Sequence, residues 1–135
     1  MPSTRELFDS LAVHAALDTQ TLASVVDALS ECEQAVTACV AGMLGAHDVD
    51  GMRSSVLCDM DCGDVALATR RLLTRATRED SALVAAQLEV CLMACRRSHE
   101  ACSRNAAAHA HCNLCAEATE RAADACRRAL QALRG

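Results

Sequence analysis

The stretch that decides the fold is VCLMACRRSHEAC, residues 90–102, which contains Cys91, Cys95 and Cys102. The intervals of four and seven residues bring the three thiols within about 40° of one another on an α-helix that turns ~100° per residue. Charged residues such as Arg96 and Glu100 fall on the opposite side of the same helix. The stretch therefore predicts an amphipathic helix whose buried face is made of thiols.

The composition favours closely packed helices over a sheet. The chain has 135 residues, which suffices for one domain with a buried core. Phe8 is the only aromatic residue besides histidine, and Pro2 is the only proline. A core poor in aromatic side chains suits helices, and a chain without internal proline leaves long helices uninterrupted.

Periodicity and helix-ending residues predict five helical segments. Gly42 and Gly45 mark the end of the first long helix, Thr77 and Asp80 form a capping box before the third, and Asn105 marks the stop before the fourth. The expected segments are a short N-terminal helix over 3–16 and long helices over 18–44, 50–75, 79–104 and 109–133. Four long helices with short connections predict an all-α fold, an up-down-up-down four-helix bundle in a single domain over 1–135.

All ten cysteines are expected on the inner faces of the four long helices, where leucine would be ordinary. These residues are Cys32, Cys39, Cys58, Cys62, Cys91, Cys95, Cys102, Cys112, Cys115 and Cys126. Alternating helix directions bring Cys39, Cys58, Cys102 and Cys112 to one end. The opposite end receives apolar residues: Val25, Leu29, Leu72, Leu73, Val84, Leu88, Leu130 and Leu133. The pattern predicts a thiol-lined half and an apolar plug.

Charge and hydropathy exclude several classes of function. The net charge is −5, all 13 basic residues are arginine and no basic run is present, so no nucleic-acid partner is expected. No stretch approaches the ~18 apolar residues of a membrane span, and the N-terminus lacks a signal peptide pattern, so a cytoplasmic protein without a membrane partner is expected. In that compartment cysteines are free thiols or metal ligands rather than disulfides.

The number of inward thiols favours a metal-binding core over simple core filling. Thiolate ligands supplemented by thioethers favour Cu(I), which accepts as few as two ligands. The pairs Cys58/Cys62 and Cys91/Cys95 lie about 6 Å apart along their helices and are expected to converge on shared ions. The residues therefore favour storage of multiple Cu(I) ions without enzymatic activity. A zinc-binding or thiol redox bundle, based on the C-x-x-C pair Cys112–Cys115, and a copper chaperone stay open as alternatives.

Weaker ligands are expected around the thiol-rich end, which we call the mouth. Histidine and methionine bind Cu(I) less tightly than thiolate pairs, so they are suited to capture ions and pass them inward. The expected mouth residues are Met43, His47, Met52, His99, His109 and His111. Asp61, close to Cys58 and Cys62, is the main carboxylate expected on an inner face. His14 is remote from the thiols and is expected at the surface.

Several segments resemble the bacterial copper storage proteins: CDMDC (58–62), CLMAC (91–95), HEAC (99–102) and HCNLCAEATERAADAC (111–126). The resemblance covers residues 18–133, and the family's short N-terminal helix matches 3–16. It implies a cytosolic four-helix bundle, commonly a homotetramer, whose core cysteines bind multiple Cu(I) ions that enter at the His/Met end. By position, the ten cysteines are the implied ligands, with the mouth residues auxiliary. The chain departs from cysteine-richer members at Ala66, Thr119 and Ala122, where further thiols are expected.

Overall fold

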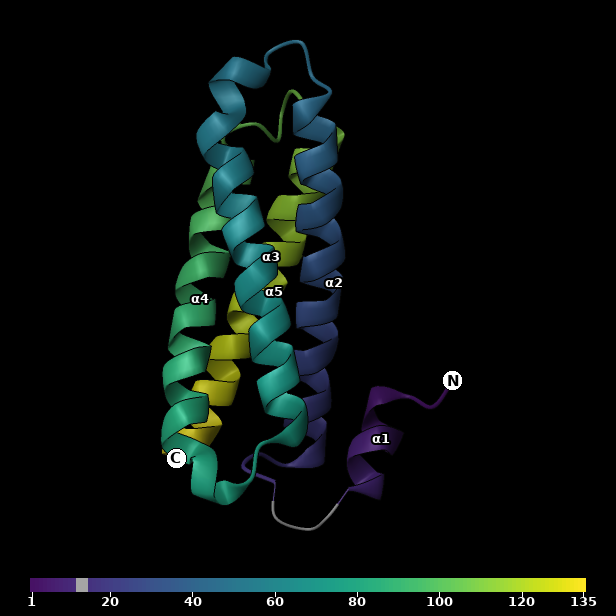
Figure 1. Cartoon of the computed structure of the whole chain (residues 1–135), viewed down its shortest axis with the longest axis vertical. Coiled ribbons are helices and arrows are strands. Elements are labelled where there is room, and N and C mark those ends of the chain that lie inside the picture. The colour runs from purple at the N-terminus through teal and green to yellow at the C-terminus, as the bar shows by residue number, and fades with distance from the viewer. Residues whose placement is uncertain (12–14) are drawn as a thin grey trace.

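The computed structural model describes residues 1–11 and 15–135 and shows an antiparallel four-helix bundle with a short helix beside it (Figure 1). The elements are α1 (Thr4–Ser10), α2 (Thr19–Leu44), the 3₁₀ turn η1 (Val49–Met52), α3 (Arg53–Arg75), the 3₁₀ turn η2 (Arg78–Asp80), α4 (Ser81–Ser103) and α5 (Ala110–Arg134). The predicted all-α bundle with an additional N-terminal helix is therefore confirmed.

The helix ends follow from local capping chemistry. The Asp18 side chain accepts a hydrogen bond from the backbone N–H of Thr21 at 2.9 Å and caps α2. The capping box of Thr77 and Asp80 forms at η2, directly before α4. Asn105 follows the end of α4, and its Nδ2 donates to the carbonyl of Ala101 at 3.2 Å. Short connections leave α2 and α4 each packed against both α3 and α5.

The N-terminal helix is shorter than the predicted segment over 3–16. The α1 helix ends at Ser10, because Leu11 is already extended. Residues 12–14, including His14, lie outside the described residues. Phe8 is the buried residue of α1, which packs against α2.

The two halves of the bundle core differ as predicted. The half nearest the start of α2 is filled by apolar side chains, including the fully enclosed Leu29, Val84 and Leu88. The half nearest the α2–η1 and α4–α5 connections is filled mainly by cysteines. No helix of the described residues is long and apolar enough to cross a membrane.

Candidate metal centre

Nine of the ten cysteines are buried, and all ten are free thiols. They come from four helices and form two neighbouring groups along the bundle axis. We call Cys32, Cys62, Cys91, Cys95 and Cys126 the central cluster. We call Cys39, Asp59, Cys102, Cys112 and Cys115 the outer cluster, which lies toward the mouth.

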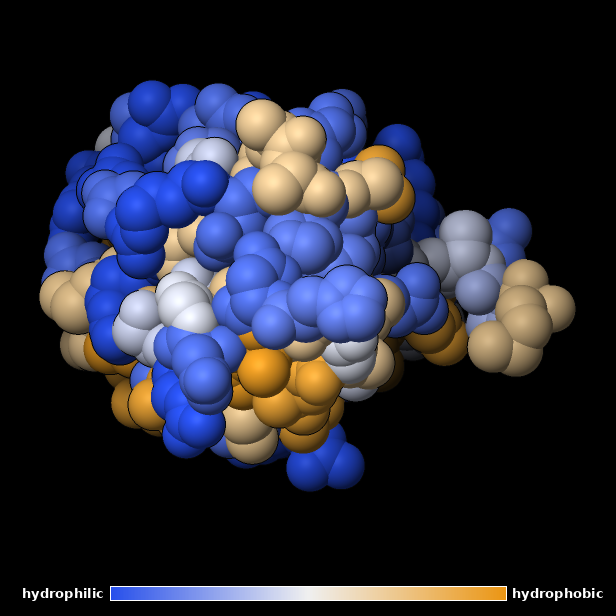
Figure 2. Space-filling view, turned by 90° about the horizontal axis from the view of Figure 1, so that it is seen from above, coloured by the Kyte–Doolittle hydropathy of each residue, from blue (hydrophilic) through white to orange (hydrophobic). Residues whose placement is uncertain are grey.

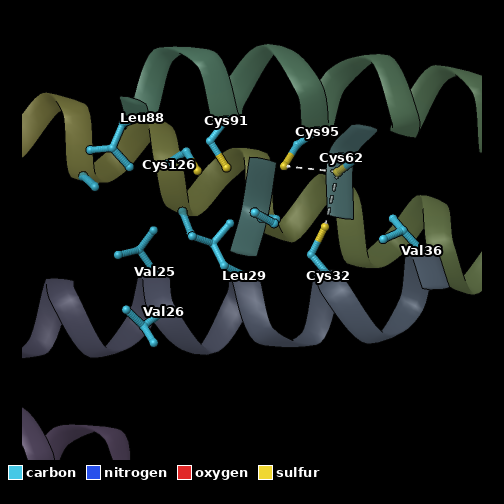
Figure 3. Packing of buried hydrophobic residues seen from close by; sticks show 14 of the residues in the cluster. Val25, Val26, Leu29, Cys32, Val36, Cys62, Leu88, Cys91, Cys95 and Cys126 are labelled. Carbon is cyan, nitrogen blue, oxygen red and sulfur yellow. Dashed lines mark hydrogen bonds between the residues drawn. The ribbon is translucent and has the colours of Figure 1, made fainter. Parts of the chain in front are cut away.

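The central cluster joins thiols from different helices. The sulfur of Cys62 on α3 lies 3.7 Å from that of Cys32 on α2 and 3.9 Å from that of Cys95 on α4 (Figure 3). Cys91 and Cys126 point into the same interior between these sulfurs and the apolar plug. Three converging sulfur atoms without a nearby carboxylate suit a soft ion of low coordination number.

The outer cluster adds one carboxylate to the sulfur ligands. The sulfur of Cys102 lies 3.1 Å from that of Cys115 and 4.0 Å from that of Cys39. The Asp59 carboxylate reaches into the group, with Oδ1 3.2 Å from the Cys102 sulfur and Oδ2 3.7 Å from the Cys115 sulfur. Ser98 Oγ donates a 2.6 Å hydrogen bond to Asp59 Oδ1 and fixes the orientation of the carboxylate.

A histidine closes the outer cluster toward solvent. His111 Nδ1 lies 3.5 Å from the sulfurs of both Cys39 and Cys112, which are themselves 3.8 Å apart. His109 stands beside it with ring centroids 5.2 Å apart, and its Nε2 lies 3.2 Å from Asp48 Oδ2. Seen from this end, the surface is mostly hydrophilic with a few apolar patches (Figure 2).

Burial and mutual contact control the protonation of the two clusters. Desolvation raises the pKa of Asp59 to about 7, although the hydrogen bond from Ser98 opposes the shift. Hydrogen bonding with Cys32 and Cys95 lowers the pKa of Cys62, and hydrogen bonding with Cys115 and Cys39 lowers the pKa of Cys102. The pKa of the neighbouring thiols Cys32, Cys95 and Cys115 is raised instead, because closely spaced thiols cannot all carry a negative charge. The thiolate form is therefore favoured at Cys62 and Cys91 in the central cluster and at Cys102 in the outer cluster.

Two predicted placements on α3 are wrong. The Asp61 side chain is 59% exposed and lies 3.8 Å from Arg97, because a residue next to Cys62 is rotated about 100° away from it. Cys58 is only half-buried, and its sulfur accepts a 3.6 Å hydrogen bond from Arg97 instead of facing Cys62. The inner stripe of α3 runs instead through Ser55, Asp59, Cys62, Ala66, Thr69 and Leu73.

The predicted mouth residues fall into three environments. His109 and His111 are half-buried at the mouth, as described above. Met43 and Met52 are buried in the core rather than presented to solvent, whereas His47 is exposed. His99 points elsewhere: its Nδ1 lies 2.8 Å from the carbonyl oxygen of Ala116, and its Nε2 lies 3.5 Å from Ser103 Oγ.

Sequence reasoning missed Asp59 and Ser98. A signal was present, because Asp59 lies three residues before Cys62 and four after Ser55, spacings that place it on the same helix face. Ser98 lies between Cys95 and Cys102, at intervals of three and four residues. Asp59 and Ser98 interrupt the apolar stripes of their helices, so the sequence pattern alone does not mark them as buried, although they belong to the site.

Comparison with known proteins identifies the family. The sequence profile of the copper storage protein family matches residues 18–131. A search of curated proteins found no match. The copper storage protein Ccsp of Streptomyces lividans, solved with 10 copper equivalents, superposes with a TM-score of 0.92 at 32% identity, over 96% of this chain and 98% of that one.

Two further structures of the Streptomyces lividans protein are also similar. One, a variant with a single histidine replaced by alanine, gives a TM-score of 0.84 at 33% identity over 88% of this chain and 99% of that one. The other, the cytosolic copper storage protein loaded with five coppers, gives 0.81 at 34% identity over 83% of this chain and 93% of that one. The chain described here belongs to the copper storage protein family.

Proposed function

We propose that the protein stores multiple Cu(I) ions inside its bundle, held by its ten cysteines. The observation that carries this proposal is the close spacing of thiols within each cluster, where buried sulfurs contributed by the four long helices lie 3.1–4.0 Å apart. Thiolates select soft cuprous ions, and sulfurs at these spacings can be drawn together by one ion or share neighbouring ions. Family membership supports the same function.

The ligands contribute unequally in this proposal. The sulfur-only central cluster holds ions most firmly, and Asp59 supplies an oxygen ligand in the outer cluster. Cys58 joins the site by rotating its side chain from Arg97 toward Cys62 when copper arrives. Asp61 pairs with Arg97 and His99 with the carbonyl of Ala116, so no part in holding or loading copper is proposed for either residue.

Zinc is the alternative that the geometry makes most specific. Three sulfurs and one carboxylate oxygen from Cys39, Cys102, Cys115 and Asp59 match the usual number of zinc ligands. The central cluster offers no second such set, because the grouping of its ligand atoms within 4.8 Å of one another contains three sulfurs, from Cys32, Cys62 and Cys95. Zinc would therefore occupy one position and leave most thiols free.

Metal content distinguishes the two functions. The protein is produced in cells supplemented with copper or with zinc, purified without oxygen and examined by elemental analysis and thiol counting. Copper storage predicts several coppers per chain and few thiols that react freely. One zinc per chain under both conditions, with most thiols still reactive, would contradict it.

The mouth is proposed as the end at which ions enter. His47, His109 and His111 are accessible there, while Met43 and Met52 are placed to receive ions below the surface. We predict that replacing His109 and His111 together by alanine slows Cu(I) loading and leaves capacity nearly unchanged, because the thiols remain. Stopped-flow absorbance of the Cu(I)–thiolate bands measures the rate, with His99→Ala as the control. An unchanged rate in the double variant would contradict the mouth assignment.

The proposal includes a cytoplasmic location and assembly as a homotetramer. The similar Streptomyces lividans protein is described as cytosolic, which supports the location. Exposed apolar side chains on α3 and α4 support self-association: Leu57, Met60, Leu67, Leu83, Val90 and Met93. Storage requires no catalysis, so no enzymatic activity is proposed. Sedimentation velocity of the metal-free and loaded protein measures the oligomeric state.

A further inference from the structure

We propose that Gly42 is a positioning residue that holds the His111 imidazole over the outer cluster. Gly42 lies on α2, one turn after Cys39 in the direction of the mouth. A Cβ atom added to Gly42 would lie 2.7 Å from His111 Cδ2 and 2.8 Å from both Cγ and Nε2. The ring therefore rests directly on the backbone of α2, in space that any other residue would fill.

The contact determines where the ring can lie. A rotation about the Cβ–Cγ bond leaves Cγ in place, so it cannot relieve a clash with an added side chain at residue 42. Relief requires rotation about the Cα–Cβ bond of His111 or a separation of α5 from α2. Rotation moves Nδ1 from its place 3.5 Å from the sulfurs of Cys39 and Cys112, whereas separation carries His111 and Cys112 together away from Cys39.

The position of the ring has two consequences. The half-buried imidazole covers two fully buried thiols, so it separates them from solvent. It also places one nitrogen with two sulfurs, all within 4.8 Å of one another, as a ready set of three ligands. Gly42 thus determines both the access to the outermost thiols and the geometry of their third ligand, without offering a ligand itself.

The first test needs no metal and so does not depend on the proposed copper storage. Reduced metal-free protein is labelled with iodoacetamide, and the rates at Cys39 and Cys112 are read by peptide mass spectrometry. We expect Gly42→Ala to raise both rates roughly tenfold, since labelling of buried groups follows local opening. Gly45→Ala is the matched control, because its added Cβ meets only ordinary contacts at 3.6 Å or more. Rates in Gly42→Ala equal to those of the wild type would overturn the proposal.

A double-mutant cycle separates positioning through His111 from a general effect on α2. His111→Ala removes the three ring atoms that the new Cβ would meet, so adding Gly42→Ala to it should change the labelling rates no further. Equal effects of Gly42→Ala with and without His111 would show that the residue acts on the helix and would overturn the proposal. Should Gly42→Ala alone fail to fold, the double variant is expected to fold, and its failure would equally contradict the clash.

The second test rests on the proposed function. Competition with a chromophoric Cu(I) chelator measures the most weakly held ions, and we expect Gly42→Ala to lower their affinity about 10- to 100-fold with unchanged capacity, as for loss of a group that orients a ligand. His111→Ala should show the same loss, and Gly45→Ala should show none. Wild-type affinity in Gly42→Ala would contradict the positioning role. Failure of the wild type itself to bind several ions would contradict the storage function and leave the labelling result standing.

Discussion

Asp59 is the residue whose environment departs most from the ordinary. It is fully enclosed, and it is the only acidic residue buried among those that the structure describes. Its partners are Ser98 and two cysteines rather than a cation. Burying a carboxylate away from water costs free energy. Such a group is expected where a cation is to be bound, because an ion arriving beside it offsets this desolvation cost.

The buried carboxyl predicts a pH-dependent stability of the metal-free protein. The pKa of Asp59 is raised from 3.8 to about 7 in the folded state, so its stabilising contribution is complete below pH 4 and is lost as pH rises through 7. Asp59→Asn should therefore gain stability over the wild type between pH 4 and 8, by up to about 4 kcal/mol. Urea unfolding of reduced apo-protein at both pH values measures this, and a constant difference between the two proteins would contradict it.

Cysteines in different surroundings should contribute differently to storage. Cys102 contacts three other groups of the outer cluster, whereas Cys58 faces Arg97 at the surface. Cys102→Ser is predicted to loosen several ions, because neighbouring ions share its sulfur. Cys58→Ser is predicted to cost at most about one ion, because Cu(I) needs few ligands and the other thiols stay in place. Chelator competition measures both, and equal losses would refute this ranking.

At the scale of the element, α3 shows where a helical pattern becomes ambiguous. The sequence offers two overlapping stripes, one through Cys58, Val65 and Leu72 and another through Asp59, Ala66 and Leu73. Cys62 and Thr69 fit both stripes. Periodicity alone therefore does not decide between two orientations of the helix that differ by a rotation about its axis of about one residue. Packing against α2 and α4 selects the second stripe, which exposes Asp61 and turns Cys58 outward.

Helix α5 predicts how capacity can be increased. Ala122 is fully buried one turn before Cys126, at a position where a further thiol is expected. Ala122→Cys should raise capacity by about one ion, since it adds one sulfur to the core. Its matched control is Ala132→Cys on the exposed side of the same helix, which adds a thiol without capacity. Cu(I) titration measures both capacities. Equal capacities in the two variants would contradict the proposal that copper binds to the thiols inside the bundle.

At the scale of the whole molecule, helix direction turns four local stripes into one polarised core. Because the helices alternate, the thiol-bearing portions of α2, α3, α4 and α5 meet in one half, and leucine and valine fill the other (Figure 3). The apolar half stabilises the bundle without metal, so the thiol half is free to lose and gain ions. A protein that stores and releases copper must stay folded when its metal has left.

The fold could be predicted from the sequence because it depends on repeated local signals. The cysteine and leucine spacings, the capping pair Thr77 and Asp80 and the short connections all indicate the same bundle. Details of the site depend on contacts between distant segments. The close approach of Gly42 and His111 joins residues that are 69 positions apart, so no local sequence pattern predicts it.

The most direct test of the account is a titration of the fully reduced apo-protein with Cu(I) under strictly anaerobic conditions. Copper bound per chain is measured against a competing chelator, and remaining thiols are counted at each step. The account predicts that several ions bind per chain and that nearly all ten thiols become protected at saturation. Saturation at one ion or fewer per chain, with most thiols still reactive, would contradict it.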